Sequence, residues 1–337
     1  MKPLSVHIDP KGMHCEIEFP QDFDALEKDL RKQLGKRNFL IVSDTNVEKH
    51  TSFLKRFKKD EVFLLDPKTD RKDWEGLRKI IAACFEKNLD RSSVLVAIGG
   101  GVVGDMSGFA ASILMRGIPV IQVSTTLLGM VDASVGGKTA INCEQGKNLL
   151  GSFHHPEKVF CCEAFLETLP ETEIKNGICE MIKHGIITSV KHFEDLEKIA
   201  NPHPTAQQIF PYVADSIAIK ADIVSRDSSE KGIRLQLNLG HTFGHALELL
   251  SNMKIPHGRA VAIGTVMAAN YALEHGLCDD ETVDRIENIF NQFDIDLMCD
   301  FDEKEIWEAM KHDKKKKDGK IRLVLPKKIG EVEVVSV

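Results

Sequence analysis

Several residues in the second half of the chain have the types and spacing of a metal site. Glu180 and Lys183 share one face of a predicted helix, and His241, His245 and His257 follow beside glycines. A carboxylate with two imidazoles suits a catalytic zinc ion that keeps one position open. His241 and His245 have the four-residue spacing of helical zinc pairs. Spacing alone leaves open whether His245 or His257 is the second imidazole.

A glycine-rich segment in the first half has the chemistry of a phosphate-binding turn. Residues 98–105 (IGGGVVGD) follow a predicted strand and open a predicted helix. Glycines there let backbone amides approach a phosphate at the positive end of the helix. The spacing differs from G-x-G-x-x-G, so a tight strand-to-helix turn is the alternative. Asp44, after an earlier strand, is placed either to hold a nucleotide ribose or to cap the next helix.

Polar side chains also follow the buried strand predicted at 120–123. Thr125, Thr126 and Asp132 come after it, and Lys138 stands next to two glycines. Side chains at the carboxyl ends of parallel strands line the ligand crevice of such sheets. The lysine indicates contact with an anion, although a lone lysine is more often a solvated surface charge. Lys147 and Asn148 are expected on the next loop and belong to the same cluster.

The elements around these residues predict an α/β fold. The first half alternates strands with helices, as in a Rossmann-like, doubly wound parallel sheet, and begins with a hairpin. Strands are expected at 5–8, 14–19, 39–43, 61–65, 93–98, 120–123 and 159–162, and helices at 47–57, 73–87 and 102–115.

The second half is predicted to be mainly α-helical and to end in a hairpin at 322–325 and 332–335. Its helices are expected at 174–187, 193–199, 206–225, 242–250, 260–274, 281–290 and 304–311. We therefore expect two domains, 1–169 and 170–337.

Composition limits the classes of partner. The chain has 337 residues, 42% of them hydrophobic, and a net charge of −7, which argues against nucleic acid as a partner. Its eight cysteines form no CxxC pair and are expected to be reduced thiols. The N-terminus lacks the apolar core of a signal peptide, and no apolar run is long enough to span a membrane. A cytoplasmic protein without membrane contact is expected.

The joint pattern of these segments closely resembles the 3-dehydroquinate synthases, a family of sugar-phosphate cyclases. The similar strings include GGGVVGD, IQVSTTLL, VDASVGGKTAIN, IKHGI, LNLGHTFGHA and AVAIG. The similarity runs with short gaps from about residue 95 to 265 and resumes at 312–315 and 321–326. It covers well over half of the chain.

The resemblance implies NAD and zinc, or cobalt, in a cleft between the two domains. The metal ligands would be Glu180, His241 and His257, and His245 becomes a substrate contact. An arginine that matches Arg116 reaches the partner subunit's site in this family, which implies a homodimer.

The remaining site residues are likewise implied by the resemblance. The matching NAD contacts are Asp44, Asn46, Gly100, Gly101, Asp105, Thr125, Thr126, Lys147 and Thr168. The matching catalytic residues are Asp132, Lys138, Lys183, Arg234, Asn238 and His245. The matching substrate contacts are Arg116, Asn148, Lys220 and a lysine of the pair Lys314 and Lys315.

The implied reaction converts 3-deoxy-D-arabino-heptulosonate 7-phosphate into 3-dehydroquinate and phosphate. It proceeds by transient oxidation with NAD, phosphate elimination, re-reduction and intramolecular aldol closure. Alternatives are a sister cyclase with another sugar phosphate and a metal-dependent polyol dehydrogenase. Lys147, Asn148 and His245 favour a 3-dehydroquinate synthase over a sister cyclase. The chain departs from the family's Gly-Glu-x-x-Lys motif at 67–72, where Asp70 and Lys72 are candidate substitutes.

Overall fold

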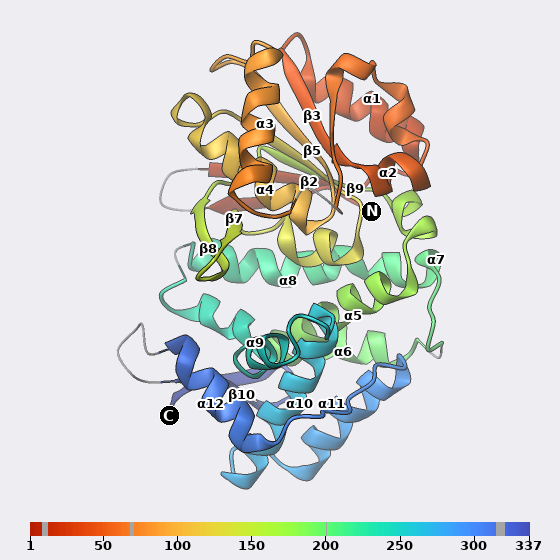
Figure 1. Ribbon diagram of the computed structural model, residues 1–337. Coiled ribbons are helices and arrows are strands. Elements are labelled where there is room, and N and C mark those ends of the chain that lie inside the picture. Colours follow the sequence, from red (N-terminus) through yellow and green to blue (C-terminus); the bar gives the residue numbers. More distant parts are fainter. Residues whose placement is uncertain (9–12, 68–70, 200, 229, 315–320) are drawn as a thin grey trace. The chain divides into compact units, whose positions relative to one another are not determined.

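The computed structural model describes residues 1–8, 13–67, 71–199, 201–228, 230–314 and 321–337 (Figure 1). The chain divides into two compact units, Met1–Leu169 and Pro170–Val337. The first contains a mostly parallel sheet and the second is mainly helical. The predicted α/β architecture is therefore observed.

The sheet of the first unit has seven strands in the order β1-β2-β9-β6-β5-β3-β4. Every neighbouring pair is parallel except the antiparallel hairpin of β1 and β2. The strands are β1 (Leu4–Ile8), β2 (Met13–Glu18), β3 (Phe39–Asp44), β4 (Val62–Leu65), β5 (Val94–Gly99), β6 (Val120–Ser124) and β9 (Lys158–Cys161). Because parallel strands leave ligand-binding side chains at their carboxyl ends, this order gathers the loops after β3, β5 and β6 along one edge.

Helices cover both faces of this sheet, so its central strands are apolar on both sides. Helices α3 (Trp74–Glu86) and α4 (Gly101–Ile113) pack on one face against alternate strand residues such as Leu95 and Ala97. Helix α1 (Phe23–Leu34) lies on the side of the sheet away from α3 (Figure 1).

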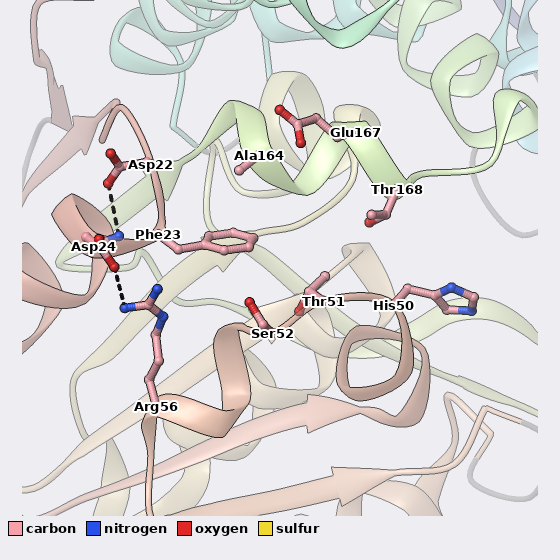
Figure 2. A pocket seen from close by; sticks show the side chains of 10 residues that line it. All are labelled: Asp22, Phe23, Asp24, His50, Thr51, Ser52, Arg56, Ala164, Glu167 and Thr168. Atoms are coloured by element: carbon pink, nitrogen blue, oxygen red, sulfur yellow. Dashed lines mark hydrogen bonds and ion pairs between the residues drawn. The ribbon is translucent and has the colours of Figure 1, made fainter.

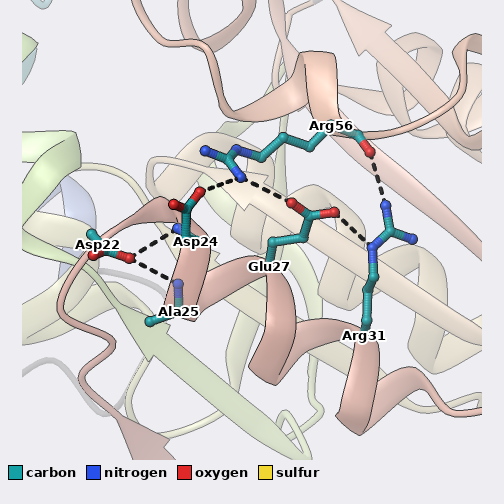
Figure 3. A network of polar contacts seen from close by, with 6 residues as sticks. All are labelled: Asp22, Asp24, Ala25, Glu27, Arg31 and Arg56. Carbon is teal, nitrogen blue, oxygen red and sulfur yellow. Dashed lines mark hydrogen bonds and ion pairs between the residues drawn. The ribbon is translucent and has the colours of Figure 1, made fainter.

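An ion-pair network joins α1 to the short 3-10 helix η1 (Phe53–Arg56) (Figure 3). The guanidinium of Arg56 lies 2.7 Å from a carboxylate oxygen of Asp24 and 2.9 Å from one of Glu27. In the same region, Phe23 and Phe53 pack with ring centroids 5.3 Å apart. Exposed ion pairs add little, so the aromatic packing is the stronger link.

Two predictions for the first unit need correction. The helix expected at 47–57 is two pieces, α2 (Thr45–His50) and η1, because Thr51 has extended backbone at φ −130° and ψ 159°. The loop expected to carry Lys147 and Asn148 is instead strand β8 (Gly146–Phe153), which pairs with β7 (Lys138–Cys143). Most side chains of β8 are exposed, so the strand shows no apolar alternation in the sequence.

The second unit is built mainly from helices and closes with the predicted hairpin. The helices are α5 (Glu171–Thr188), α6 (Val190–Glu197), α7 (Ala206–Ile209), α8 (Val213–Arg226), α9 (His241–Leu250), α10 (His257–Glu274), α11 (Asp280–Gln292) and α12 (Glu303–Lys314), and the hairpin is β10 (Arg322–Lys328) with β11 (Glu331–Ser336). The single helix expected at 206–225 is interrupted by a 3-10 turn containing Pro211, which has no backbone N–H to donate.

Helices α9 and α10 approach each other backbone to backbone. A Cβ on Gly264 would lie 2.1 Å from the carbonyl oxygen of Gly240. A Cβ on Gly240 would lie 2.5 Å from the carbonyl oxygen of Val261, and its φ of +75° also favours glycine. These contacts fix the spacing of the two helices.

A buried histidine on α6 gives the second unit a predicted pH dependence. Only 3% of His192 is exposed, and burial lowers its pKa from 6.5 to about 4. The unfolded chain then binds the proton more readily, so stability falls as the pH drops from 6.5 towards 4. We expect a loss of up to roughly 3 kcal/mol, to be measured by urea unfolding between pH 7 and pH 4. Between pH 7 and pH 4 the free energy of unfolding of His192→Phe should fall less than that of the wild type, by this amount. Parallel curves of unfolding free energy against pH for the two proteins would contradict the prediction.

Within the part of the chain that the structure describes, no helix is both long enough and apolar enough to cross a bilayer.

Candidate metal centre and cofactor-binding residues

Three helices of the second unit bring Glu180, His241 and His257 together. Glu180 lies in the middle of α5 and is fully buried. His241 is the first residue of α9, after the left-handed Gly240, and His257 is the first residue of α10. Both imidazoles thus stand at helix starts, where the chain can turn them towards the carboxylate.

The two imidazoles face the same carboxylate oxygen. Nε2 of His241 and Nε2 of His257 each lie 3.7 Å from Oε1 of Glu180. Nδ1 of His241 lies 3.1 Å from the carbonyl oxygen of Leu239, and Nδ1 of His257 lies 3.4 Å from Oε1 of Glu248. An oxygen near each Nδ1 favours a hydrogen on that atom, so Nε2, which faces Glu180, is the nitrogen that each ring would offer to a metal ion.

The two carboxylate oxygens of Glu180 have different surroundings. The ammonium of Lys183 lies against Oε2, whereas Oε1 is buried and accepts no hydrogen bond from the residues that the structure describes. Burial raises the pKa of Glu180, but Lys183 and the imidazoles outweigh it and hold the pKa well below its ordinary value. Lys183 compensates the ionised carboxylate on its Oε2 side, and Oε1, which faces the two imidazole nitrogens, is the oxygen that would bind a metal ion.

The pKa values of the two histidines move in opposite directions. Burial and the charge of Lys183 lower the pKa of His241 to about 3. Burial also lowers that of His257, but the carboxylates of Glu180 and Glu248 outweigh it and raise the pKa to about 9. A metal ion must therefore displace a proton from the His257 ring when it binds.

The donor atoms fit a divalent transition metal. Each of the two Nε2 atoms lies 3.7 Å from Oε1 of Glu180, a separation that two bonds of about 2.0–2.2 Å to one zinc ion can span. Three protein donors leave a fourth position for substrate oxygens. The predicted set Glu180, His241 and His257 is thus brought together, while its role as a metal site stays a prediction.

The other predicted site residues of the second unit have different surroundings. The ring of His245 lies 5.5 Å from that of His241, centroid to centroid. Arg234 is 1% exposed and donates to the carbonyl oxygen of Ser228. Asn238 donates to Glu230 at 3.3 Å, and Lys220 is buried on α8. Lys314 ends α12, but its side chain and all of Lys315 lie outside the described residues.

Predicted NAD contacts of the first unit converge at the carboxyl ends of β5 and β6. Gly100, Gly101 and Asp105 line one narrow cleft together with Ser124. A Cβ on Gly100 would lie 2.9 Å from Cγ2 of Thr126. The glycine therefore keeps the turn open where a strand end and a helix start meet.

Asp44 caps the helix that follows it. Its Oδ1 accepts from the backbone N–H groups of Asn46 and Val47 at 2.8 and 2.9 Å. Burial raises the pKa of Asp44 above its ordinary value. The capping alternative is therefore observed, and a ribose contact would have to share this carboxylate.

Lys72 joins two of the predicted site residues. Its Nζ lies 2.5 Å from Oδ2 of Asp105 and 2.6 Å from Oδ1 of Asn148. The carbonyl oxygen of Lys72 also accepts from the backbone N–H of Asn142 at 2.7 Å. Of the two residues considered for the divergent motif, Lys72 thus reaches the predicted site, and Asp70 lies outside the described residues.

Thr168 lines a hollow of about 420 Å³, and none of the residues just described lines it. Figure 2 shows it beside His50 and Thr51, at the end of α2. Asp44 and Asn46 stand at the start of the same helix. The predicted NAD contacts thus occur at both ends of α2.

The sequence patterns missed Glu248 as a site residue. It follows His241 by seven residues on α9, two helical turns away and on the same face. That periodicity is the signal that could have identified it.

Solved structures of other proteins share this fold. A 2-deoxy-scyllo-inosose synthase, solved with carbaglucose-6-phosphate, NAD+ and Co2+, superposes with a TM-score of 0.86 at 24% identity and covers 100% of this chain and 96% of its own. A 2-epi-5-epi-valiolone synthase from Streptomyces hygroscopicus, with NAD+ and Zn2+ bound, gives 0.85 at 24% identity, over 95% and 92%. These likenesses define the class of fold.

The matches in sequence identify a family, whereas the structural likenesses identify only a fold. The profile "3-dehydroquinate synthase N-terminal" matches residues 62–176, and "3-dehydroquinate synthase C-terminal" matches 177–316. The 3-dehydroquinate synthase of Shewanella denitrificans is 44% identical over 311 residues, covering 90% of this chain and 87% of the relative. That of Prochlorococcus marinus is 39% identical, over 89% and 86%. The chain belongs to the 3-dehydroquinate synthase family.

Proposed function

We propose that the chain converts 3-deoxy-D-arabino-heptulosonate 7-phosphate into 3-dehydroquinate and phosphate, with NAD and a divalent metal as cofactors. The observation that carries the cofactor part is the convergence of two Nε2 atoms on one oxygen of the buried Glu180. Donors of this kind bind zinc or cobalt and leave a position for substrate hydroxyl groups.

The protein's own groups suit an anionic substrate. When bound, the metal supplies Lewis acidity at a substrate hydroxyl group, and NAD supplies a reversible acceptor for hydride. Lys183, Lys220 and Arg234 are buried cations that can bind the carboxylate and phosphate of the substrate and hold it in place. We propose that His245, whose ring lies 5.5 Å from that of His241, moves a proton at the substrate.

A turnover assay tests the proposal. The purified chain is mixed with the heptulosonate phosphate, catalytic NAD and zinc or cobalt, and released phosphate and product are measured. We expect one phosphate per 3-dehydroquinate and no accumulating NADH, because the hydride returns to the substrate. Stoichiometric NADH would instead identify a polyol dehydrogenase. Turnover only with another sugar phosphate would identify a sister cyclase.

We propose that NAD binds to the residues of the first unit named above and that Lys72 holds Asp105 and Asn148 in place. Lys72→Met removes two charge-assisted contacts, which are worth about 1.5–3 kcal/mol each when one partner is charged. We expect the KM for NAD to rise at least about tenfold, as measured by steady-state kinetics. Lys87→Met is the matched control, because Lys87 forms an ion pair with the exposed Asp60. Equal KM values for both variants would contradict the role of Lys72.

We also propose a homodimer in which Arg116 serves the partner's active site. Arg116 is exposed, and it lies in a turn where Met115, Arg116 and Gly117 all have positive φ. Light scattering of the purified chain measures the oligomeric state, and a monomer with full activity would contradict the proposal.

A further inference from the structure

Glu248 has no part in the proposed chemistry, yet its carboxylate is buried beside a donor histidine. Only 5% of the residue is exposed, and its Oε1 lies 3.4 Å from Nδ1 of His257. Taking a carboxylate out of water is costly unless cations or hydrogen-bond donors compensate it. The imidazole of His257 supplies such compensation.

The backbone around Glu248 holds it at a fixed distance from His257. Its carbonyl oxygen accepts from the N–H of Met253 at 2.7 Å and from Oγ of Ser251 at 3.1 Å. Asn252 and Met253 have φ of 50° and 62°, which closes a tight turn after α9. The turn returns the chain so that α10 begins, at His257, next to the last turn of α9.

The two donor histidines differ in what fixes their rings. Nδ1 of His241 faces a main-chain oxygen, that of Leu239, which no side-chain substitution removes. Nδ1 of His257 faces the side chain of Glu248. A carboxylate at this position both fixes the tautomer and makes the imidazole a stronger metal donor.

We propose that Glu248 is a positioning residue of the metal centre, which accepts the Nδ1–H of His257 and so directs Nε2 towards Glu180. The inference rests on the metal proposed above. Glu248 lies against the Nδ1 side of the ring, whereas Glu180 faces Nε2. It therefore acts through His257 and is not a fourth metal ligand.

Cobalt binding tests this role without reference to turnover. Metal-stripped, full-length protein is titrated with Co2+, and affinity and the visible absorption spectrum are recorded. Glu248→Leu should weaken binding roughly 10- to 100-fold and shift the Co2+ absorption bands. Glu248→Gln keeps an oxygen that can accept from Nδ1, so it should lose less affinity. Glu197→Gln is the matched control, because it breaks an ion pair with Arg285, 2.7 Å long, on α6, which carries none of the three donors.

The outcomes separate the metal from the positioning role. A wild-type chain that binds no Co2+ would overturn the proposed metal centre and this role together. Wild-type binding with equal affinity and spectrum in both Glu248 variants would overturn the role of Glu248 alone. An equal loss in Glu197→Gln would also overturn it, since the effect would then be general destabilisation. If Glu248→Leu does not fold, the Gln variant decides by the same two measurements.

Discussion

Replacing Glu180 by glutamine is expected to abolish tight binding of zinc or cobalt. The variant keeps an oxygen at this position but loses the negative charge that faces the two imidazoles. It therefore alters a proposed metal ligand itself and not a residue that only supports a ligand. The loss should therefore exceed the roughly 100-fold upper value for residues that only support a ligand. Metal content after dialysis against a buffered zinc solution measures this, and phosphate release should fall with it.

Folding has to be separated from metal binding in this experiment. Glu180→Gln leaves the ammonium of Lys183, 1% exposed, without its carboxylate, which costs about 3–5 kcal/mol when a buried pair is broken. His241→Gln avoids that cost, because burial keeps this imidazole neutral, with a pKa of about 3. Glu173→Gln, on the first turn of the same helix, is the control that should retain the metal. Full zinc occupancy in folded Glu180→Gln and His241→Gln would exclude the proposed site.

The second large effect is expected from Gly264→Ala. The added methyl group would lie 2.1 Å from the carbonyl oxygen of Gly240, and backbone of a packed helix cannot yield as a side chain can. We expect the free energy of unfolding to fall by at least about 3 kcal/mol, as measured by urea denaturation. Zinc affinity should fall as well, because His241 and His257 begin the two helices that are forced apart.

Gly104→Ala is the control for this variant. It is also a glycine inside a helix, but the nearest atom to its added Cβ would be 3.6 Å away, an ordinary contact. Alanine is favoured over glycine in helix interiors by up to about 1 kcal/mol, so this variant should be as stable as the wild type or more so. If both substitutions have the same effect, the close contact of α9 and α10 does not limit stability.

The fold is predictable from the sequence where the hydrophobic pattern is strong. The run Val94–Gly99 is buried throughout, and its continuous apolar, β-branched residues are typical of a central strand. Strand β8 gives no such signal, since its hydrogen bonds with β7 stabilise a segment whose side chains are mostly exposed. The break in the helix expected at 206–225 depends on Pro211. The residues on both sides of it have helical periodicity, so the pattern predicts one continuous helix.

The candidate site is only partly predictable from spacing. His241 and His245 have the interval of a helical metal pair, yet the ring that shares the Glu180 oxygen with His241 belongs to His257. That position depends on the left-handed turn at Asn252 and Met253, which no periodicity describes. The resemblance to a family identified His257, because it carried information about tertiary contacts that the pattern of residues lacks.

The composition of the donor set also determines which ions can compete for it. Mg2+ and Ca2+, which are abundant in cells, prefer six or more oxygen ligands, whereas two of the three donors here are imidazole nitrogens. Zinc, cobalt and neighbouring transition metals accept nitrogen donors readily. Helices α9 and α10 are in direct backbone contact, so their starts, which carry His241 and His257, have little freedom to move apart. In the proposed centre, we expect this packing to add to the preference for transition metals that the two imidazoles confer.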